Sequence, residues 1–362
     1  MTTVHVVVPE VVDDPARPSG GSTYDRRACD GLAALDWTVR EHRAAGDWPR
    51  ADGTSHAALA AMLTGIPENA VLLVDGLVAS AAPEVLVREA TRLRLVVLIH
   101  LPLGVDQATG GESRAATHGG DTRSRECAVL HAATLVVATS RWTRDWLLVA
   151  YGLEPRRVRV VPPGVEPADV VPGSAAGGGL LCVGAVTPAK GHDVLVDALA
   201  GVVELQWSCA CVGSTAVDGS FAERVRSVAA AKGLRNRLQF TGPRIGRDLA
   251  AAYGAADVVV APSRTETYGM VVTEALARGI PVVGSEVGGL PEALGRTASG
   301  ALPGILVPPG DPASLAAALR RWLTDAPLRD DLRRAAHERR GTLTDWSVTV
   351  DGVSRVLAEV AA

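Results

Sequence analysis

Residues Asp257–Gly289 read DVVVAPSRTETYGMVVTEALARGIPVVGSEVGG, and this stretch decides the fold. The apolar run DVVVAPS predicts a buried strand, and the polar turn RTETYG leads into the helix-forming segment MVVTEALARG. Gly279 is placed to end that helix, because glycine is favoured just beyond a helix C-terminus. The next run, IPVVGS, predicts a second strand, so the stretch is a strand–helix–strand unit of a parallel sheet.

The same alternation extends over the rest of the chain. Short apolar runs typical of parallel strands lie at Val4–Val8, Val71–Val74, Leu95–Ile99, Leu135–Ala138, Val158–Val161, Leu180–Val183, Ser208–Val212, Leu238–Phe240, Val258–Val260, Ile280–Val283 and Ile305–Val307. Between them lie segments with helical spacing, such as Asp193–Ala200, Phe221–Lys232 and Ser314–Trp322. Strand and helix in repeated alternation predict a doubly wound α/β protein.

The domain boundary is predicted at Val165–Gly179, which reads VEPADVVPGSAAGGG and loses all periodicity. Enough strands for one open sheet lie on each side, so we expect two Rossmann-like domains, residues 1–168 and 177–345, facing a central cleft. A second polar stretch, Asp106–Glu126, is expected to be either a functional irregular loop or a surface insertion.

Composition excludes several classes of function. The chain has 362 residues, 47% of them apolar and 21% charged, and a net charge of −4, which offers no field for binding nucleic acid. Its five cysteines form no CxxC pair, so we expect reduced cysteines and neither a zinc site nor a redox dithiol. No signal peptide and no apolar run of about 20 residues is present, so we expect a cytoplasmic protein without stable membrane anchoring.

The loops that follow the two strands of Asp257–Gly289 suit a nucleoside diphosphate. They leave the carboxyl ends of parallel strands, where open α/β sheets bind ligands. The N-terminus of a helix attracts phosphate, and Gly269 lets the backbone approach it. Glu274 on that helix is a candidate ligand for a ribose diol, and Glu266 on the loop is a candidate ligand for sugar hydroxyls.

The spacing of Glu266 and Glu274 resembles the E-x7-E signature of retaining glycosyltransferases with the GT-B fold, in glycosyltransferase family 4. Gly179–Ala200, GLLCVGAVTPAKGHDVLVDALA, is similar to the first strand, turn and helix of that family's C-terminal domain. Lys190 matches its "KG" position, where a lysine would neutralise the diphosphate. The resemblance also assigns donor binding to the loop residues Tyr268, Gly269, Met270 and Val271.

One departure concerns the diphosphate. The family often has an arginine directly after the glycine of the strand before the "KG" turn, and this chain has Ala185 there. Either Lys190 acts alone, or Arg244 or Arg264 takes the place of the missing cation.

The first half of the chain resembles the family more loosely. Gly20 and Gly21, in PSGGS, match a glycine-rich loop near the diphosphate, and two glycines would let backbone N–H groups approach phosphate. His100 ends a strand and matches the family's cleft histidine. Alternatively, His100 is a structural residue in apolar surroundings. Asp75 also ends a strand, where it either orients an acceptor or caps the next turn.

The resemblance implies transfer of a sugar from a nucleotide-sugar donor, with UDP favoured and GDP possible, to an acceptor with retention of configuration. It assigns His100, Lys190 and Glu266 to catalysis, requires no metal and no other cofactor, and sends a C-terminal helix, residues 346–362, back to the N-terminal domain. The balanced charges of Arg26–Arg43 favour a soluble small-molecule acceptor over a lipid.

Three alternatives remain open at this point. A nicotinamide-dependent dehydrogenase is disfavoured because neither half has a GxGxxG turn. A GT-B sugar-nucleotide epimerase or phosphorylase shares the expected fold. A non-catalytic nucleotide-binding protein would explain Ala185, but Lys190, Glu266 and Glu274 are all present.

Overall fold

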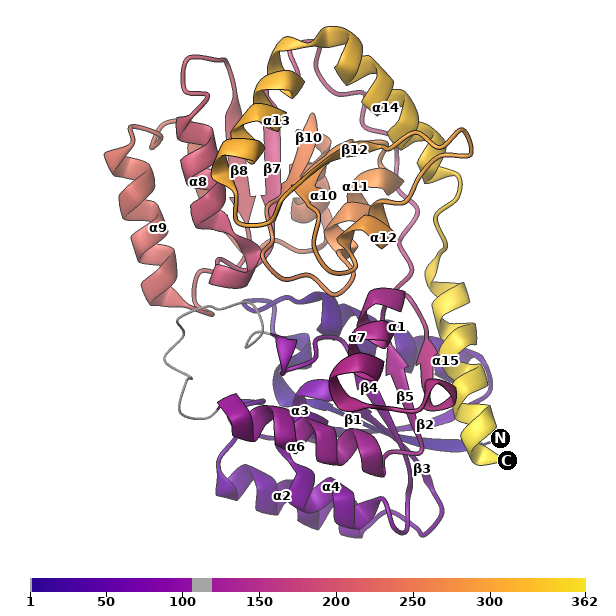
Figure 1. Cartoon of the computed structure of the whole chain (residues 1–362). Helices are drawn as coiled ribbons and strands as arrows, with labels where there is room; N and C mark the ends of the chain where they lie inside the picture. The colour runs from indigo at the N-terminus through magenta and orange to yellow at the C-terminus, as the bar shows by residue number, and fades with distance from the viewer. Residues whose placement is uncertain (1, 106–118) are drawn as a thin grey trace. The chain divides into compact units, whose positions relative to one another are not determined.

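The computed structural model describes residues 2–105 and 119–362. These residues form two compact units (Figure 1). The first unit takes the chain up to Asp13, Gly20–Gly164 and Trp346–Ala362, and the second takes Asp14–Ser19 and Val165–Asp345.

The first unit is built on a six-stranded sheet with the order β2-β1-β3-β4-β5-β6, in which every neighbouring pair is parallel. Its strands are β1 (Thr3–Pro9), β2 (Thr38–Ala44), β3 (Val71–Asp75), β4 (Arg94–Ile99), β5 (Leu135–Ala138) and β6 (Val158–Val160). Its helices are η1 (Glu10–Asp13), α1 (Gly20–Ala34), α2 (Gly53–Thr64), α3 (Gly76–Ala81), α4 (Pro83–Glu89), α6 (Gly119–Ala132), α7 (Arg141–Tyr151), η2 (Pro155–Arg157) and α15 (Trp346–Ala361).

Helices cover both faces of this sheet. One face packs Leu72 and Val74 against buried side chains of α2, α3, α4, α6 and α7. On the other side α15 contacts β3, β4 and β5, and it also packs on α1. Gly31 of α1 permits that packing, because a Cβ there would lie 2.3 Å from a methyl group of Val350.

The second unit repeats the architecture, with the strand order β12-β11-β10-β7-β8-β9 and parallel neighbours throughout. Its strands are β7 (Gly179–Val183), β8 (Ser208–Val212), β9 (Leu238–Gly242), β10 (Val258–Ala261), β11 (Val282–Ser285) and β12 (Gly304–Val307). Its helices are η3 (Pro188–Lys190), α8 (His192–Ala200), α9 (Gly219–Ala231), α10 (Gly246–Gly254), α11 (Met270–Ala277), α12 (Leu290–Leu294), α13 (Pro312–Thr324) and α14 (Ala326–Arg340).

Strand alternation divides the core of the second unit into two layers. Leu180 and Cys182 of β7 pack with α8, α9 and α13, whereas Leu181 packs with α10, α11 and α12. Two parallel sheets, each covered by helices, confirm the predicted α/β class with doubly wound domains. Within the described ranges, no helix is long and apolar enough to cross a membrane.

The apolar runs miss one strand, β2. Its sequence, TVREHRA, has only one buried residue, because β2 lies at the edge of the sheet and pairs with β1 alone. Edge strands carry charged side chains that prevent pairing with other chains. A search for continuous apolar runs therefore cannot find such a strand.

The expected irregular stretch Asp106–Glu126 is partly wrong. Residues 106–118 lie outside the described part of the chain, but helix α6 begins at Gly119 and includes Glu126. Glu126 is fully buried and accepts hydrogen bonds from the backbone N–H groups of Leu103 and Gly104 and from the hydroxyl groups of Ser80 and Tyr151. The polar composition of this helix start thus reflects a buried carboxylate with four donors.

Candidate active site

The structure distributes the predicted site residues over the two units. The first unit holds Gly20, Gly21 and His100, and the second holds Lys190, Glu266, Tyr268, Gly269, Met270, Val271 and Glu274. Each group is described within its own unit.

The loop between β10 and α11 is built for close backbone packing. Gly269 precedes α11 with φ +98°, a left-handed conformation that favours glycine. Gly288, in the loop after β11, has φ +58°, and a Cβ there would lie 1.7 Å from the carbonyl oxygen of Glu266. Gly289 donates its N–H to the same oxygen at 2.9 Å. The two loops that the sequence places at strand ends therefore fix the backbone of Glu266.

Lys190 and Glu266, which are distant in sequence, form an ion pair. Lys190 Nζ lies 2.7 Å from Glu266 Oε2, and the two side chains are 34% and 10% exposed. Gly184 lies beside the lysine stem, and a Cβ there would contact Lys190 Cγ and Cδ at an ordinary 3.5 Å. Glu266 Cγ lies beside Gly269, so the pair sits at the N-terminal end of α11.

Arg264, one of the two suggested replacements for the missing arginine, is bound elsewhere. Its guanidinium donates two hydrogen bonds of 2.7 Å to the carboxylate of Asp193 and one of 2.9 Å to the carbonyl of Pro188. Hydrogen bonding to Asp193 raises the pKa of Arg264. Arg264 therefore braces the turn that carries Lys190, while Ala185 is half-buried in that turn. The other suggestion, Arg244, lies between β9 and α10.

Glu274 is half-buried on α11, and its carboxylate accepts a hydrogen bond of 2.6 Å from the hydroxyl of Tyr253 on α10. Burial raises the pKa of Glu274, and the hydrogen bond from Tyr253 and the charge of Arg278 oppose this shift. Arg278 lies over the Tyr253 ring, 4.4 Å from its centre, and donates to the backbone carbonyl of Glu274. Within the described part of the chain, no hydrogen bond or ion pair joins the Glu274 side chain to Lys190 or Glu266.

The remaining predicted residues of this loop line the start of α11. Tyr268 and Val271 are partly buried against the core of the α11 side of the sheet. Burial, with the charge of Glu292, raises the pKa of Tyr268 to about 12, so its hydroxyl stays protonated at neutral pH. Met270 is the first residue of α11 and is half-buried.

In the first unit, Gly20 and Gly21 are the first two residues of α1. A Cβ on Gly21 would lie 3.1 Å from His100 Cδ2, which is tighter than most real contacts. Glycine at this position therefore lets the start of α1 approach the imidazole ring. The structure brings together two residues that the sequence placed 79 positions apart.

His100 lies between two buried carboxylates. Its Nε2 is 2.9 Å from Asp25 Oδ1 and 3.5 Å from Asp75 Oδ2, and both aspartates are about 4% exposed. Burial alone would lower the pKa of His100, but the charges of Asp25 and Asp75 outweigh it and raise the pKa. Burial and the nearby Asp25 raise the pKa of Asp75 to about 7. Asp75 thus changes its charge near neutral pH, beside an imidazole whose own pKa is raised.

Asp75 also fulfils the capping role suggested by sequence, since its Oδ1 accepts the N–H of Leu77 at 2.7 Å. Sequence reasoning missed Asp25 and Tyr253. Both belong to helices whose charge pattern is ordinary, and only the fold shows that their polar atoms face a site residue.

Two groups of three side chains in the described residues are close enough to hold a metal ion. One is the trio of Asp25, Asp75 and His100, and the other lies in the core of the second unit. In the first trio the direct hydrogen bond between His100 and Asp25 already satisfies both groups.

Comparison with known proteins matches both halves of the chain. Residues 4–169 match the family described as Glycosyltransferase Family 4, and residues 179–339 match the one described as Glycosyl transferases group 1. The chain is similar to a D-inositol 3-phosphate glycosyltransferase from Acidothermus cellulolyticus, with 37% identity over 66% of this chain and 56% of that protein. It spans only 52% to 62% of the length of the curated relatives it matches.

Solved structures show the same fold. Sucrose-phosphate synthase from Thermosynechococcus elongatus superposes with a TM-score of 0.81 and 24% identity, covering 99% of both chains. Anabaena HepE in complex with UDP-glucose superposes with a TM-score of 0.75 and 17% identity, covering 99% of this chain and 100% of that one. The fold agrees with the two family matches, and the chain belongs to the GT-B glycosyltransferases of the family 4 type.

Proposed function

We propose that this protein is a retaining glycosyltransferase that moves a sugar from a nucleotide-sugar donor, most simply a UDP-sugar, to a soluble small-molecule acceptor. The observation that supports this proposal best is the ion pair of Lys190 and Glu266 at the start of α11. It places a cation, a carboxylate and a helix N-terminus together, which is what a sugar diphosphate needs for binding and departure.

Donor binding would exchange partners within this pair. Lys190 would leave Glu266 for the diphosphate, where it stabilises the negative charge that grows as the sugar departs. Glu266 would then accept hydrogen bonds from hydroxyl groups of the sugar. Arg264 and Asp193 would keep the lysine turn in place during the exchange. Glu274, held by Tyr253, would accept the ribose hydroxyls.

The first unit would supply the polar contacts to the transferred sugar or the acceptor. His100 is held through Nε2 by Asp25, which fixes the orientation of the ring. In the retaining reaction proposed here, the acceptor attacks from the side of the leaving group and its proton passes to the departing phosphate. The step needs neither a protein nucleophile nor, in our proposal, a divalent metal.

The relatives give the proposal its substrate classes. The curated relatives are named for transfer to D-inositol 3-phosphate, a small phosphorylated polyol, and HepE was solved with UDP-glucose. We propose acceptors of the same small, polar kind for this chain. This agrees with the balanced charges of Arg26–Arg43.

The experiment compares thermal shifts with UDP, GDP and their sugars for the native chain, Glu274→Gln and the exposed control Glu223→Gln. A donor at about 100 times its dissociation constant adds about 2.7 kcal/mol of stability. We expect one nucleotide to stabilise the native chain and the control but not Glu274→Gln. Stabilisation of all three chains to the same extent would remove Glu274 from the donor site.

Product analysis tests the reaction itself. Incubation of the preferred donor with inositol phosphates and simple sugars, followed by NMR of the anomeric proton, should give a glycoside with the configuration of the donor. An inverted product would refute retention. Isomerised donor without acceptor would identify an epimerase, and nucleotide binding without any transfer would identify a non-catalytic protein.

A further inference from the structure

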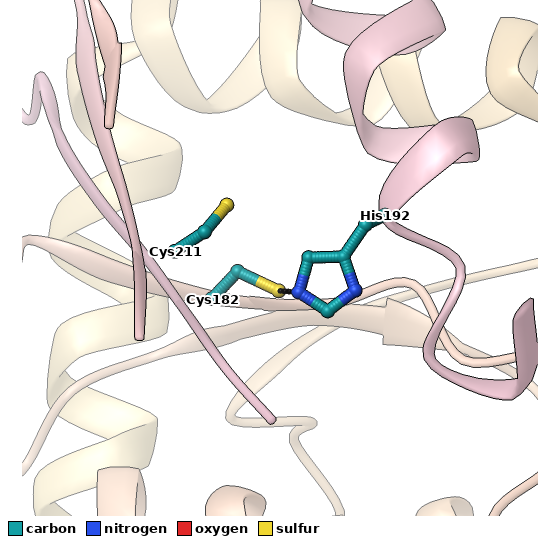
Figure 2. Close-up of side chains that lie close together, drawn as sticks. All are labelled: Cys182, His192 and Cys211. Atoms are coloured by element: carbon teal, nitrogen blue, oxygen red, sulfur yellow. Dashed lines mark hydrogen bonds between the residues drawn. The ribbon is translucent and has the colours of Figure 1, made fainter. Parts of the chain in front are cut away.

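Three side chains with soft or nitrogen ligand atoms converge in the core of the second unit (Figure 2). Cys182 lies on β7, Cys211 lies on β8 and His192 is the first residue of α8. All three are buried, with exposed fractions of 2%, 1% and 0%. Their two Sγ atoms and one imidazole nitrogen all lie within 4.8 Å of one another.

The fold explains why the sequence does not reveal this cluster. Parallel register pairs Cys182 with Cys211 across β7 and β8, although they are 29 positions apart. The turn after β7 then reverses the chain, so that α8 returns over the sheet and places the His192 ring beside the sulfur of Cys182 (Figure 2). A CxxC pair consists of neighbours along the chain, so a search for such pairs cannot find ligands that strand pairing brings together.

The distance between Cys182 and His192 suits two ligands of one zinc ion. Zinc bonds to sulfur at about 2.3 Å and to imidazole nitrogen at about 2.0–2.1 Å, so tetrahedral angles separate a sulfur from a nitrogen ligand by about 3.5 Å. Cys182 Sγ and His192 Nε2 are 3.7 Å apart. Two sulfur ligands of zinc are separated by about 3.8 Å, and the two Sγ atoms here lie within 4.8 Å of each other.

Hydrogen bonding leaves the imidazole of His192 poorly satisfied. Its Nε2 faces only the sulfur of Cys182, and its Nδ1 has no partner among the described residues. A buried polar group without a strong hydrogen bond destabilises the fold. A metal bond at Nε2 would replace this weak contact with a strong one, and Nδ1 would stay as it is.

The charges also fit. A metal would draw both thiols into the thiolate form, and two thiolates neutralise the charge of a divalent ion. The resulting centre is neutral, as an apolar core requires.

We propose that Cys182, His192 and Cys211 bind one zinc ion that stabilises the second unit. The ion would join the end of β7 to the start of α8 and so close the turn that carries Lys190. Its role is structural, since all three ligands are buried in the core. None of the three ligands is a residue to which we assign a contact with the donor.

The test uses the full chain produced in medium supplied with cobalt in place of zinc, because cobalt reports its ligands by absorption. We expect one cobalt per chain, with the intense visible bands of tetrahedral cobalt and a thiolate-to-cobalt charge-transfer band. The variant Cys211→Ala should lose the charge-transfer band and the stoichiometric metal. The control Cys29→Ala removes a buried thiol from the other unit and should bind cobalt like the native chain.

A second readout guards against misfolding of the variant. Chains freed of metal by a chelator during refolding should melt at similar temperatures, whereas zinc added during refolding should raise the melting temperature of the native chain and Cys29→Ala only. Native protein that folds without bound cobalt or zinc would overturn the proposal. So would equal binding by Cys211→Ala, which would place the metal elsewhere.

Discussion

Asp75→Asn should change how the stability of the protein depends on pH. Asp75 is 4% exposed, and burial followed by repulsion from Asp25 raises its pKa from 3.8 to about 7. The amide oxygen of asparagine can still accept the N–H of Leu77, so the cap of α3 survives. It removes only the negative charge that forms next to Asp25 as the pH rises.

The sign follows from proton linkage. A carboxyl group with a raised pKa in the folded state binds its proton more tightly there, so its contribution to stability is complete below pH 3.8 and is lost as the pH rises through about 7. Between pH 5 and pH 8 the two pKa values give a loss of about 2 pH units, or about 2.6 kcal/mol. His100 acts in the same direction, because Asp75 helps to raise its pKa.

Calorimetric melts of the native chain and Asp75→Asn at pH 5, 6, 7 and 8 would measure this effect. The melting temperature of Asp75→Asn should gain about 5–10 °C on that of the native chain between pH 5 and pH 8, at about 2–4 °C per kcal/mol for a unit of this size. Asp52→Asn is the matched control, because Asp52 also caps a helix but its hydrogen bonds to Ser55 lower its pKa. Parallel curves for the native chain and Asp75→Asn would refute the raised pKa of Asp75.

Three further substitutions probe the site and its supports. Gly288→Ala puts a methyl group 1.7 Å from a backbone oxygen, so we expect denaturation curves to show a free energy of unfolding lower by about 3 kcal/mol or more. The control Gly233→Ala, at φ +74° with open space around it, should lower it by only about 1–2 kcal/mol. Glu126→Gln replaces one acceptor oxygen by an amide group that faces other donors. Chemical unfolding should show a free energy of unfolding lower by about 2–4 kcal/mol. An unchanged midpoint would show that the Glu126 carboxylate does not stabilise the fold. Tyr253→Phe removes the hydrogen bond that opposes the effect of burial on Glu274, so the pKa of Glu274 should rise further. Calorimetric titration should then show donor binding about tenfold weaker at neutral pH and partly restored at higher pH. A uniform loss of affinity at every pH would contradict this reasoning.

Most of the fold is predictable from sequence because central strands of a parallel sheet are covered on both faces. Such strands are continuous apolar runs, as β3 shows with five buried residues in succession. The rule fails where its physical basis fails. Strand β2 has one neighbour and partial solvent contact, and α6 begins with polar residues that include the buried Glu126.

The same distinction separates the site residues that the sequence predicts from those that it does not. Glu266, Gly269 and Glu274 are recognisable because one short segment fixes their spacing on a loop and a helix. Asp25 and Tyr253 are not recognisable, because their roles depend on contacts across 75 and 21 positions that local patterns do not encode. Cys182 and Cys211 likewise come together through strand pairing rather than through their spacing in the sequence.

The polar residues of the site share a further property, which bears on how the protein would bind a donor. Lys190, Glu274 and His100 each have a charged or hydrogen-bonding partner before any ligand arrives. Partners that a ligand must displace reduce its affinity, whereas partners that stay in place hold the group in position. The Lys190–Glu266 pair belongs to the first kind in our proposal, because both groups would turn to the donor. The partners of Glu274 and His100 belong to the second, because each carboxylate or ring has further atoms to offer. Replacing Glu266 should therefore tighten the binding of the free nucleotide while it removes transfer, because Lys190 then has no partner to leave. Replacing Tyr253, the retained partner of Glu274, should weaken both.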